Sequence, residues 1–334
     1  MTRADTAGQT ARTERARGVG LVGRALIRHL GSAVVVLLVV TFAAFALVRA
    51  TPGNSATSIA VRQAGAGATQ EQIDRIRDEL HLDDSLVVQY GAWLSRAVTG
   101  DLGRSERTGR PVAEEIADRL PRTLFLAGGS AVLAILLGLG AGIVSAVVRR
   151  GPLPGLLRLG ALLGASVPPF WLAFVLIAFL SERLHLLPTS GQSGPASWVM
   201  PWLVLAVPAG AIISRVVAVA LADALAQPYV GAARARGRST WSVVWRDALP
   251  NAVGSTLHVT ALQVGMILTG TVIVETVFAW PGLGAWFVDA VKFRDNWSIL
   301  AAVLVFAIGF VLITRLADLL QVAGDPRLRR EETP

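Results

Sequence analysis

Six long runs with almost no charged residue constrain this 334-residue chain more than any other feature. A hydrocarbon core about 30 Å thick takes roughly 20 apolar residues of helix to cross. Lipid offers backbone groups no hydrogen-bond partner, so each run is predicted to be a helix, and the chain an all-α membrane protein with six spans. The runs lie at 30–48, 124–148, 159–180, 198–222, within 248–274, and at 297–314.

The composition supports this prediction. Only 16% of the residues are charged, whereas a soluble domain carries about 25%. The chain has no cysteine, which excludes disulfides, thiolate metal sites and cysteine nucleophiles. The four histidines show no metal-site spacing, and we expect no metal site; they are His29, His81, His185 and His258.

The arginines predict the orientation. With the N-terminus inside, the inner segments 1–29, 149–158, 215–247 and 315–334 hold 18 Arg, whereas the short outer loops 181–197 and 275–296 hold 3 basic residues. Short loops rich in Arg and Lys stay in the cytoplasm, so both termini are predicted to be cytoplasmic. The same distribution explains the net charge of +8 without nucleic-acid binding.

The two ends of the chain and the outer segment complete the predicted organisation. Residues 1–29 are predicted to be a disordered cytoplasmic tail, and 30–48 a retained helix, since its apolar run is longer than that of a signal peptide. Residues 49–121 are predicted to form an outer helical lobe. There, Thr69 and Gln72 resemble a capping box for a helix to about residue 80.

Two more helices are expected in this lobe, one of them amphipathic over 85–97, with Leu86, Tyr90, Trp93 and Leu94 on one face. The other is a short helix over 111–120. A purely structural lobe and a docking surface for an outside partner are both open.

The inner loop 223–250 carries the most informative pattern. Pro228 suits the first position of a helix, and Gly237 can adopt the left-handed conformation that ends it. Ser239 can cap a second short helix, which Leu249-Pro250 is expected to stop. One interpretation is an interfacial helix anchored by tryptophans. The other is a protrusion that fits a groove on a partner protein.

Four polar residues lie in or beside the predicted spans. Arg215 interrupts the fourth span, where it either has a function or extends to the interface. Glu275, at the outer end of the fifth span, either caps a neighbouring helix or pairs with an arginine. His258 and Gln263 are candidates for a substrate pathway, although packing is the simpler interpretation. A proline pair, Pro168-Pro169, is predicted to kink the third span.

The inner loop resembles the cytoplasmic motif of ABC importer permeases, Glu-Ala-Ala-x3-Gly-x9-Ile-x-Leu-Pro. Here it reads Gly231-Ala232-Ala233-x3-Gly237, then nine residues, then Asp247-Ala248-Leu249-Pro250. Gly231 replaces the Glu and Asp247 replaces the Ile.

Further segments resemble the dipeptide/oligopeptide/nickel branch of this family. They are Pro52-Gly53-Asn54, Leu102–Val112 with Arg119–Leu124, Glu275–Gly284 and Asp325-Pro326-Arg327.

The resemblance implies a type I ABC importer permease fold. Residues 122–322 would form the transmembrane domain, and 323–334 a cytoplasmic tail. It also implies that ATPases dock on a coupling helix, and the implied docking residues are Tyr229, Gly231, Ala232, Ala233, Arg236, Gly237, Leu249 and Pro250.

The expected partners follow from the same resemblance. They are a second homologous permease subunit in a heterodimer, two cytoplasmic ATPases that use ATP and Mg²⁺, and an extracytoplasmic substrate-binding protein. The chain itself would bind no cofactor and catalyse no reaction, and it has no phosphate-loop motif.

The expected function is import of dipeptides or oligopeptides across the bacterial plasma membrane by alternating access. A nickel chelate or another solute is the alternative cargo. An ion-coupled secondary transporter is the alternative class, although its usual paired inverted repeats and buried carboxylates are not evident.

Overall fold

The computed structural model describes residues 31–50, 69–79, 84–148 and 150–324, and these ranges are helical apart from turns and one isolated bridge between Arg104 and Pro111. The predicted N-terminal tail, the predicted C-terminal tail beyond Gly324, and the segments Pro52-Gly53-Asn54 and Asp325-Pro326-Arg327 lie outside them; the first two residues of the predicted C-terminal tail belong to the last helix. The helices are Gly31–Ala50, α3 (Gln70–Glu79), α4 (Leu86–Val98), α5 (Val112–Val147), α6 (Leu153–Ser166), α7 (Pro169–Leu176), the π-helix η2 (Ile177–Arg183), α8 (Ala196–Leu225), α9 (Pro228–Ala235), α10 (Thr240–Val243), the π-helix η3 (Val244–Ala248), α11 (Leu249–Val277), α12 (Leu283–Lys292) and α13 (Asn296–Gly324).

The six predicted spans are present, the third in broken form. Within the described ranges, five helices are long and apolar enough to cross a membrane, and the pair α6 and α7–η2 makes a sixth span if counted together. That pair bends by 108°. The bend falls at Pro168-Pro169, where the prolines remove backbone donors and Pro168 starts the next helix as its N-cap.

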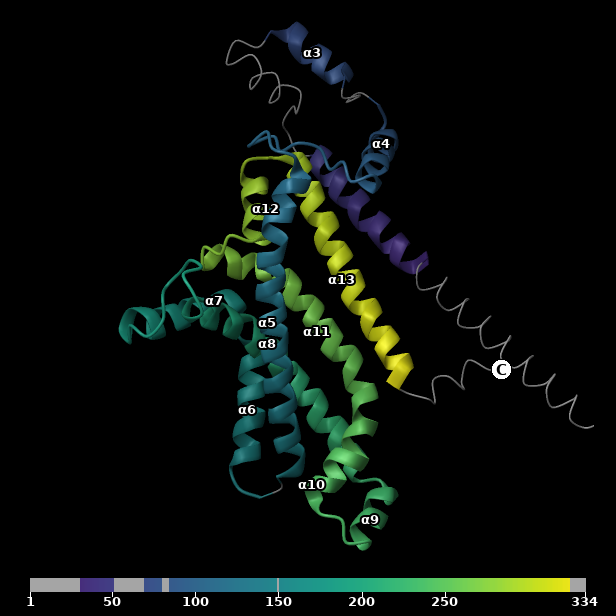
Figure 1. Ribbon diagram of the computed structural model, residues 1–334, viewed down its shortest axis with the longest axis vertical. Coiled ribbons are helices and arrows are strands. Elements are labelled where there is room, and N and C mark those ends of the chain that lie inside the picture. Colours follow the sequence, from purple (N-terminus) through teal and green to yellow (C-terminus); the bar gives the residue numbers. More distant parts are fainter. Residues whose placement is uncertain (1–30, 51–68, 80–83, 149, 325–334) are drawn as a thin grey trace, which may run out of the picture.

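The two ends of the bundle differ in character (Figure 1). The α5–α6 connection and the α9–α10 element lie at one end, and α3, α4 and α12 lie at the other. The first is the arginine-rich side and is called the inner, cytoplasmic end; the second is called the outer end. This arrangement agrees with the predicted topology.

The core forms where α5 packs closely on α8. A Cβ on Gly138 would lie 2.6 Å from the Ile213 side chain, and one on Gly142 would lie 2.8 Å from the Ser214 carbonyl oxygen. Small residues at such positions let membrane helices approach closely. The sequence therefore places glycine where these two helices touch.

Helix α5 corrects one prediction. The expected short helix over 111–120 is not separate, because α5 runs without interruption from Val112 to Val147 with Pro121 inside it. A proline removes only one backbone donor, and neighbouring groups in a membrane helix compensate for that loss. At 1.5 Å per residue these 36 residues span about 54 Å, so α5 extends well beyond the hydrocarbon core.

The prediction that the second short helix stops at Leu249-Pro250 is also wrong. The chain continues as helix from α10 through η3 into α11, with Pro250 in the first turn of α11. The π-helical segment Val244–Ala248 ends two residues before this proline. Its wider turn shifts the hydrogen-bond register, which lets the helix pass a residue without an N–H.

The outer lobe begins with the predicted capping box. The Gln72 N–H donates to Thr69 Oγ1 at 3.3 Å, and the Thr69 N–H donates to Gln72 Oε1 at 2.9 Å. The helix that follows, α3, ends at Glu79, close to the predicted end.

Helix α4 packs on the first span through Tyr90 and Trp93, which contact Phe45. Hydroxyl groups of Tyr90 and Thr41 are 2.8 Å apart. Leu86, predicted on the same face, is instead exposed, because it lies at the first residue of α4.

Candidate functional site

The α9–α10 element at the inner end is the first candidate site. Helix α9 ends in a Schellman motif, in which the Gly237 N–H donates to Arg234 O at 2.9 Å and the Arg238 N–H donates to Ala233 O at 3.3 Å. Gly237 has φ of 78°, a conformation that other residues adopt only with strain. The predicted Ser239 cap is present, since Ser239 Oγ accepts from the Ser242 N–H at 3.3 Å.

An ion pair joins the turn after α9 to the π-helix η3. Arg238 Nη1 lies 2.8 Å from each carboxylate oxygen of Asp247. Asp247 stands where the family motif has an isoleucine. The departure from the motif therefore has a structural explanation, because this aspartate fixes the turn at Gly237 from the other side.

The two faces of α9 have different roles. Val230 and Ala233 are each 1% exposed and join α9 to the bundle core. The outward face carries the other predicted docking residues of this helix and its cap, namely Tyr229, Gly231, Ala232 and Arg236, all exposed. Leu249 is half-buried and Pro250 is exposed at the start of α11. Ala233 is thus an anchor and its neighbours form the accessible surface.

The two tryptophans of the inner element lie on its exposed side. Trp241 is 54% exposed and Trp245 is 57% exposed, whereas Val243, Val244 and Ala248 are buried. The change from α-helix to π-helix at Val244 alters the angular spacing, so residues three and four apart do not share one face here.

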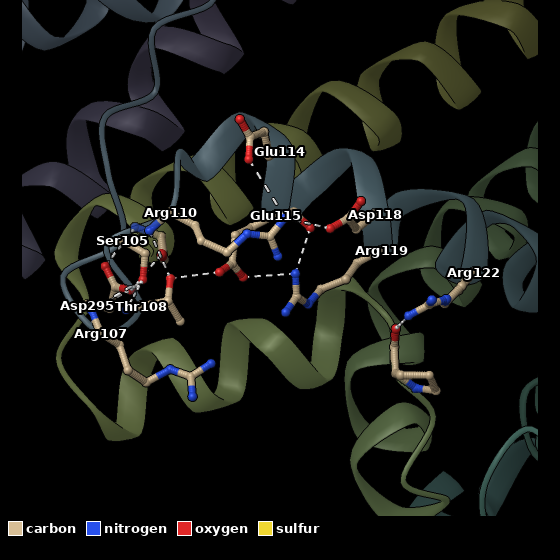
Figure 2. Close-up of polar contacts among 12 residues, drawn as sticks. Ser105, Arg107, Thr108, Arg110, Glu114, Glu115, Asp118, Arg119, Arg122 and Asp295 are labelled. Carbon is tan, nitrogen blue, oxygen red and sulfur yellow. Dashed lines mark hydrogen bonds and ion pairs between the residues drawn. The ribbon is translucent and has the colours of Figure 1, made fainter.

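The outer polar network is the second candidate site, and Figure 2 shows how its charged side chains converge from α5, the preceding loop and the start of α13. Asp295 is 1% exposed. It accepts from the Ser105 hydroxyl, from the Glu106 N–H at 2.9 Å and from the Ser298 hydroxyl at 2.8 Å. One carboxylate therefore caps α13 and holds the loop before α5.

Glu115 forms the centre of this network. Its side chain is 1% exposed, lies 2.8 Å from Arg119 Nη1, and accepts from the Thr108 hydroxyl at 2.8 Å. Arg119 also stacks 5.7 Å above the Trp286 ring of α12. On the solvent side, Asp118 accepts from Arg110 and raises the pKa of that guanidinium above its usual value.

Glu275 caps α12 and binds no arginine among the described residues. Its carboxylate is buried and accepts from the Gly284 N–H at 2.6 Å, the Ala285 N–H at 3.0 Å and the Thr123 hydroxyl at 2.7 Å. A Cβ on Gly282 would lie 2.4 Å from this carboxylate. The Glu275–Gly284 segment is therefore a helix-capping unit that ties α11 to α12 and α5.

The remaining predicted residues do not gather at one point. His258 Nδ1 lies 3.8 Å from Asp318 Oδ1, and Arg315 Nη1 lies 3.2 Å from Oδ2 of the same carboxylate. Gln263 is half-buried on α11. Arg215 is exposed on α8 beside a cavity. These residues therefore form no common central site. Most of the polar contacts described above lie at the two ends of the helix bundle.

Sequence reasoning missed Asp295 and Glu115. Each lies in one of the predicted outer segments, where acidic residues are common. Neither has a spacing to other polar residues that distinguishes it. Asp295 lies just before a span and three residues before Ser298. This position is typical of a helix cap, and it is the one signal that could have identified Asp295.

Comparisons with known proteins agree on one family. The profile described as "Binding-protein-dependent transport system inner membrane component" matches residues 138–330, and its N-terminal counterpart matches 22–127. The chain belongs to this family: it is the permease subunit of an ABC importer, a multi-pass protein of the bacterial plasma membrane and not an enzyme.

Individual relatives place it in the peptide branch of that family. The glutathione transport system permease protein GsiC of Escherichia coli strain K12 is 37% identical over 304 residues, which cover 91% of this chain and 98% of the relative. The protein of the same name from Shigella boydii serotype 4 is 36% identical over the same shares.

Among solved structures, the inward-facing MetNI methionine ABC transporter matches with a TM-score of 0.49 and 23% identity. The match covers 66% of this chain and 96% of the other.

Proposed function

We propose that this chain imports short peptides, as one half of a permease heterodimer in which the α9–α10 element receives the force of partner ATPases. Family membership supplies the coarser statement, that such permeases work with ATPases and a binding protein. It also removes the alternative of an ion-coupled secondary transporter. The docking residues, the heterodimer and the cargo are the proposal.

The observation that carries the docking proposal is the construction of the inner element. A Schellman motif, a serine cap and the Arg238–Asp247 pair fix a short helix that is anchored by two buried residues and exposes the rest. An element that transmits force must move as a unit. The small residues Gly231 and Ala232 on its exposed side leave room for another surface to approach closely.

Nucleotide chemistry belongs to the partners in this proposal. ATP and Mg²⁺ would be bound by the ATPases, and this chain would contribute neither ligands nor a catalytic group. Closure of the ATPases would then move α9, and α9 would move the inner ends of α8 and α11 to which it is joined.

The cargo proposal is supported by the relatives at 36–37% identity, whose names specify glutathione, a tripeptide. A nickel chelate or another solute stays the alternative. Within the described residues, no group of three or more His, Asp or Glu side chains could hold a bare metal ion.

Copurification of the ATPases with the permease tests the docking proposal. Tyr229→Glu should reduce the retained ATPase by about tenfold or more, because it buries a charge at the proposed interface. Phe293→Glu is the matched control, since Phe293 is also an exposed aromatic residue but lies at the outer end. Equal ATPase retention in both variants would refute docking at α9.

Uptake by the complete transporter in vesicles tests the cargo. Labelled dipeptides, glutathione and a nickel chelate should be compared with ATP inside and the binding protein outside. Uptake of the chelate with no competition from either peptide would overturn the cargo proposal and leave the docking proposal unaffected.

A further inference from the structure

A cavity at the inner end has no role in the proposed function. It has a volume of about 710 Å³ and lies between the end of α5, the start of α6 and the inner half of α8. Arg158 and Arg215 both line it, together with apolar residues such as Leu162 and Val219. A second cavity of about 480 Å³ shares Arg215 and Val219.

The position of the two arginines along their helices places the cavity at the headgroup level of the inner leaflet. Helices α8 and α13 both run from the outer to the inner end (Figure 1). Arg215 follows Trp198 by 17 residues and Arg315 follows Trp297 by 18. These lengths correspond to about 26 Å of helix, close to the hydrocarbon thickness. Arg158 directly precedes the uncharged run that begins at Leu159.

The cavity carries positive charge that the described residues do not neutralise. Arg158 and Arg215 are exposed, and neither has an ion pair or hydrogen bond within those ranges. Asp223 lines only the smaller cavity. Pro154 and Gly155, in the first turn of α6, also line the larger cavity, so the positive end of that helix adds to the potential.

We propose that this cavity binds the phosphate-bearing headgroup of an anionic phospholipid from the cytoplasmic leaflet. Arg158 and Arg215 donate hydrogen bonds to the phosphate oxygens, which guanidinium groups match in geometry. An acyl chain then lies along Leu162 and Val219, whose exposed fractions are 53% and 63%. A soluble anion would use the same arginines and gain nothing from this apolar wall.

Native mass spectrometry of the complete transporter tests the proposal. The complex is taken from nanodiscs of phosphatidylcholine with a minority of phosphatidylglycerol, and bound lipids are counted. We expect the wild type to retain phosphatidylglycerol selectively, and the Arg158→Gln/Arg215→Gln double variant to retain about tenfold less. Arg183→Gln, which removes an exposed arginine at the end of η2, is the matched control and should retain it fully.

A second variant keeps both charges and fills the space. Ala222→Trp places an indole in the cavity, and we expect the same loss of phosphatidylglycerol as in the double variant. Full retention in both variants would overturn the proposal, and so would a wild type that retains no anionic lipid.

A calorimetric titration with inorganic phosphate separates the two possible sources of the anion. The titration uses complexes in pure phosphatidylcholine. No binding of inorganic phosphate supports a lipid site. Phosphate binding that the double variant loses would show a site for a soluble anion and would likewise overturn the lipid proposal.

Discussion

Replacing Asp295 with alanine tests whether the outer polar network stabilises the bundle. The carboxylate is buried and accepts hydrogen bonds from Ser105, Glu106 and Ser298. Loss of a helix cap costs about 0.5–2 kcal/mol, and each lost hydrogen bond to a charged acceptor costs about 1.5–3 kcal/mol. Water replaces part of these bonds, so we expect Asp295→Ala to lower the free energy of unfolding by about 3–5 kcal/mol.

Thermal unfolding of the detergent-solubilised protein, followed by circular dichroism at a fixed scan rate, measures the effect. A loss of this size lowers Tm by roughly 6–20 °C for a domain of about 200 residues. Asp289→Ala is the control, because Asp289 is 48% exposed and only 3.5 Å from an exposed Lys292; its expected cost is below about 1 kcal/mol.

A double-mutant cycle makes the test specific to this contact. Ser105→Ala alone removes one donor to Asp295, and combined with Asp295→Ala it should add less than its single effect, because the two side chains share a hydrogen bond. If Asp295→Ala lowered Tm no more than Asp289→Ala does, or if the two substitutions were additive, the assigned role of the network would be refuted.

Three further outcomes are expected. Gly284→Ala should destabilise by about 1–3 kcal/mol in the same melting assay, since its Cβ would lie 2.6 Å from the Val272 Cα, whereas Gly128→Ala, with nothing within 4 Å, should have little effect. Tyr90→Phe should cost about 1 kcal/mol, because its hydroxyl contacts Thr41; an unchanged Tm would contradict this. Asp247→Ala should leave the permease folded but lower transport per ATP hydrolysed, measured in vesicles, because it frees the turn held by Arg238; unchanged coupling would argue against that role.

The spans were predictable because their signal is strong. Long apolar runs and an uneven distribution of arginines between the two sides are direct consequences of the bilayer as a solvent. They predicted the number of spans and the topology. The helix N-caps were equally predictable from the sequence. Thr69 and Ser239 each cap the helix that follows, as their side-chain chemistry predicts.

Whether a helix continues through a proline was not predictable from one sequence. Pro250 was expected to stop a helix and the helix over 111–120 was expected to be short, yet Pro250 and Pro121 both lie within continuous helix. Pro168-Pro169 does break its span. The difference lies in the surroundings. A π-helical segment precedes Pro250, whereas beside Pro121 the Arg119 side chain stacks on Trp286 and Arg122 donates to Pro281 O; neither arrangement is encoded in the local pattern.

The outer polar network escaped prediction for a related reason. Its bonds join residues far apart in the sequence, such as Ser105 and Asp295, which are 190 positions apart. Periodicity and motif spacing report only near neighbours along the chain. The resemblance marked the segments that take part, but only the folded arrangement shows that they hold one another.

The length of α5 has a mechanical consequence. One helix carries Glu115 in the outer polar network and Ser145 at the cavity near the cytoplasm. Pro121 is the place inside it where the hydrogen-bond ladder lacks a donor. Helices bend most readily at such a residue, and the 26 residues beyond it have a length of about 39 Å. A swing of about 10° at that point would carry the far end sideways by about 7 Å. A movement at the outer polar network would then be transmitted by one helix to the cytoplasmic end of the bundle.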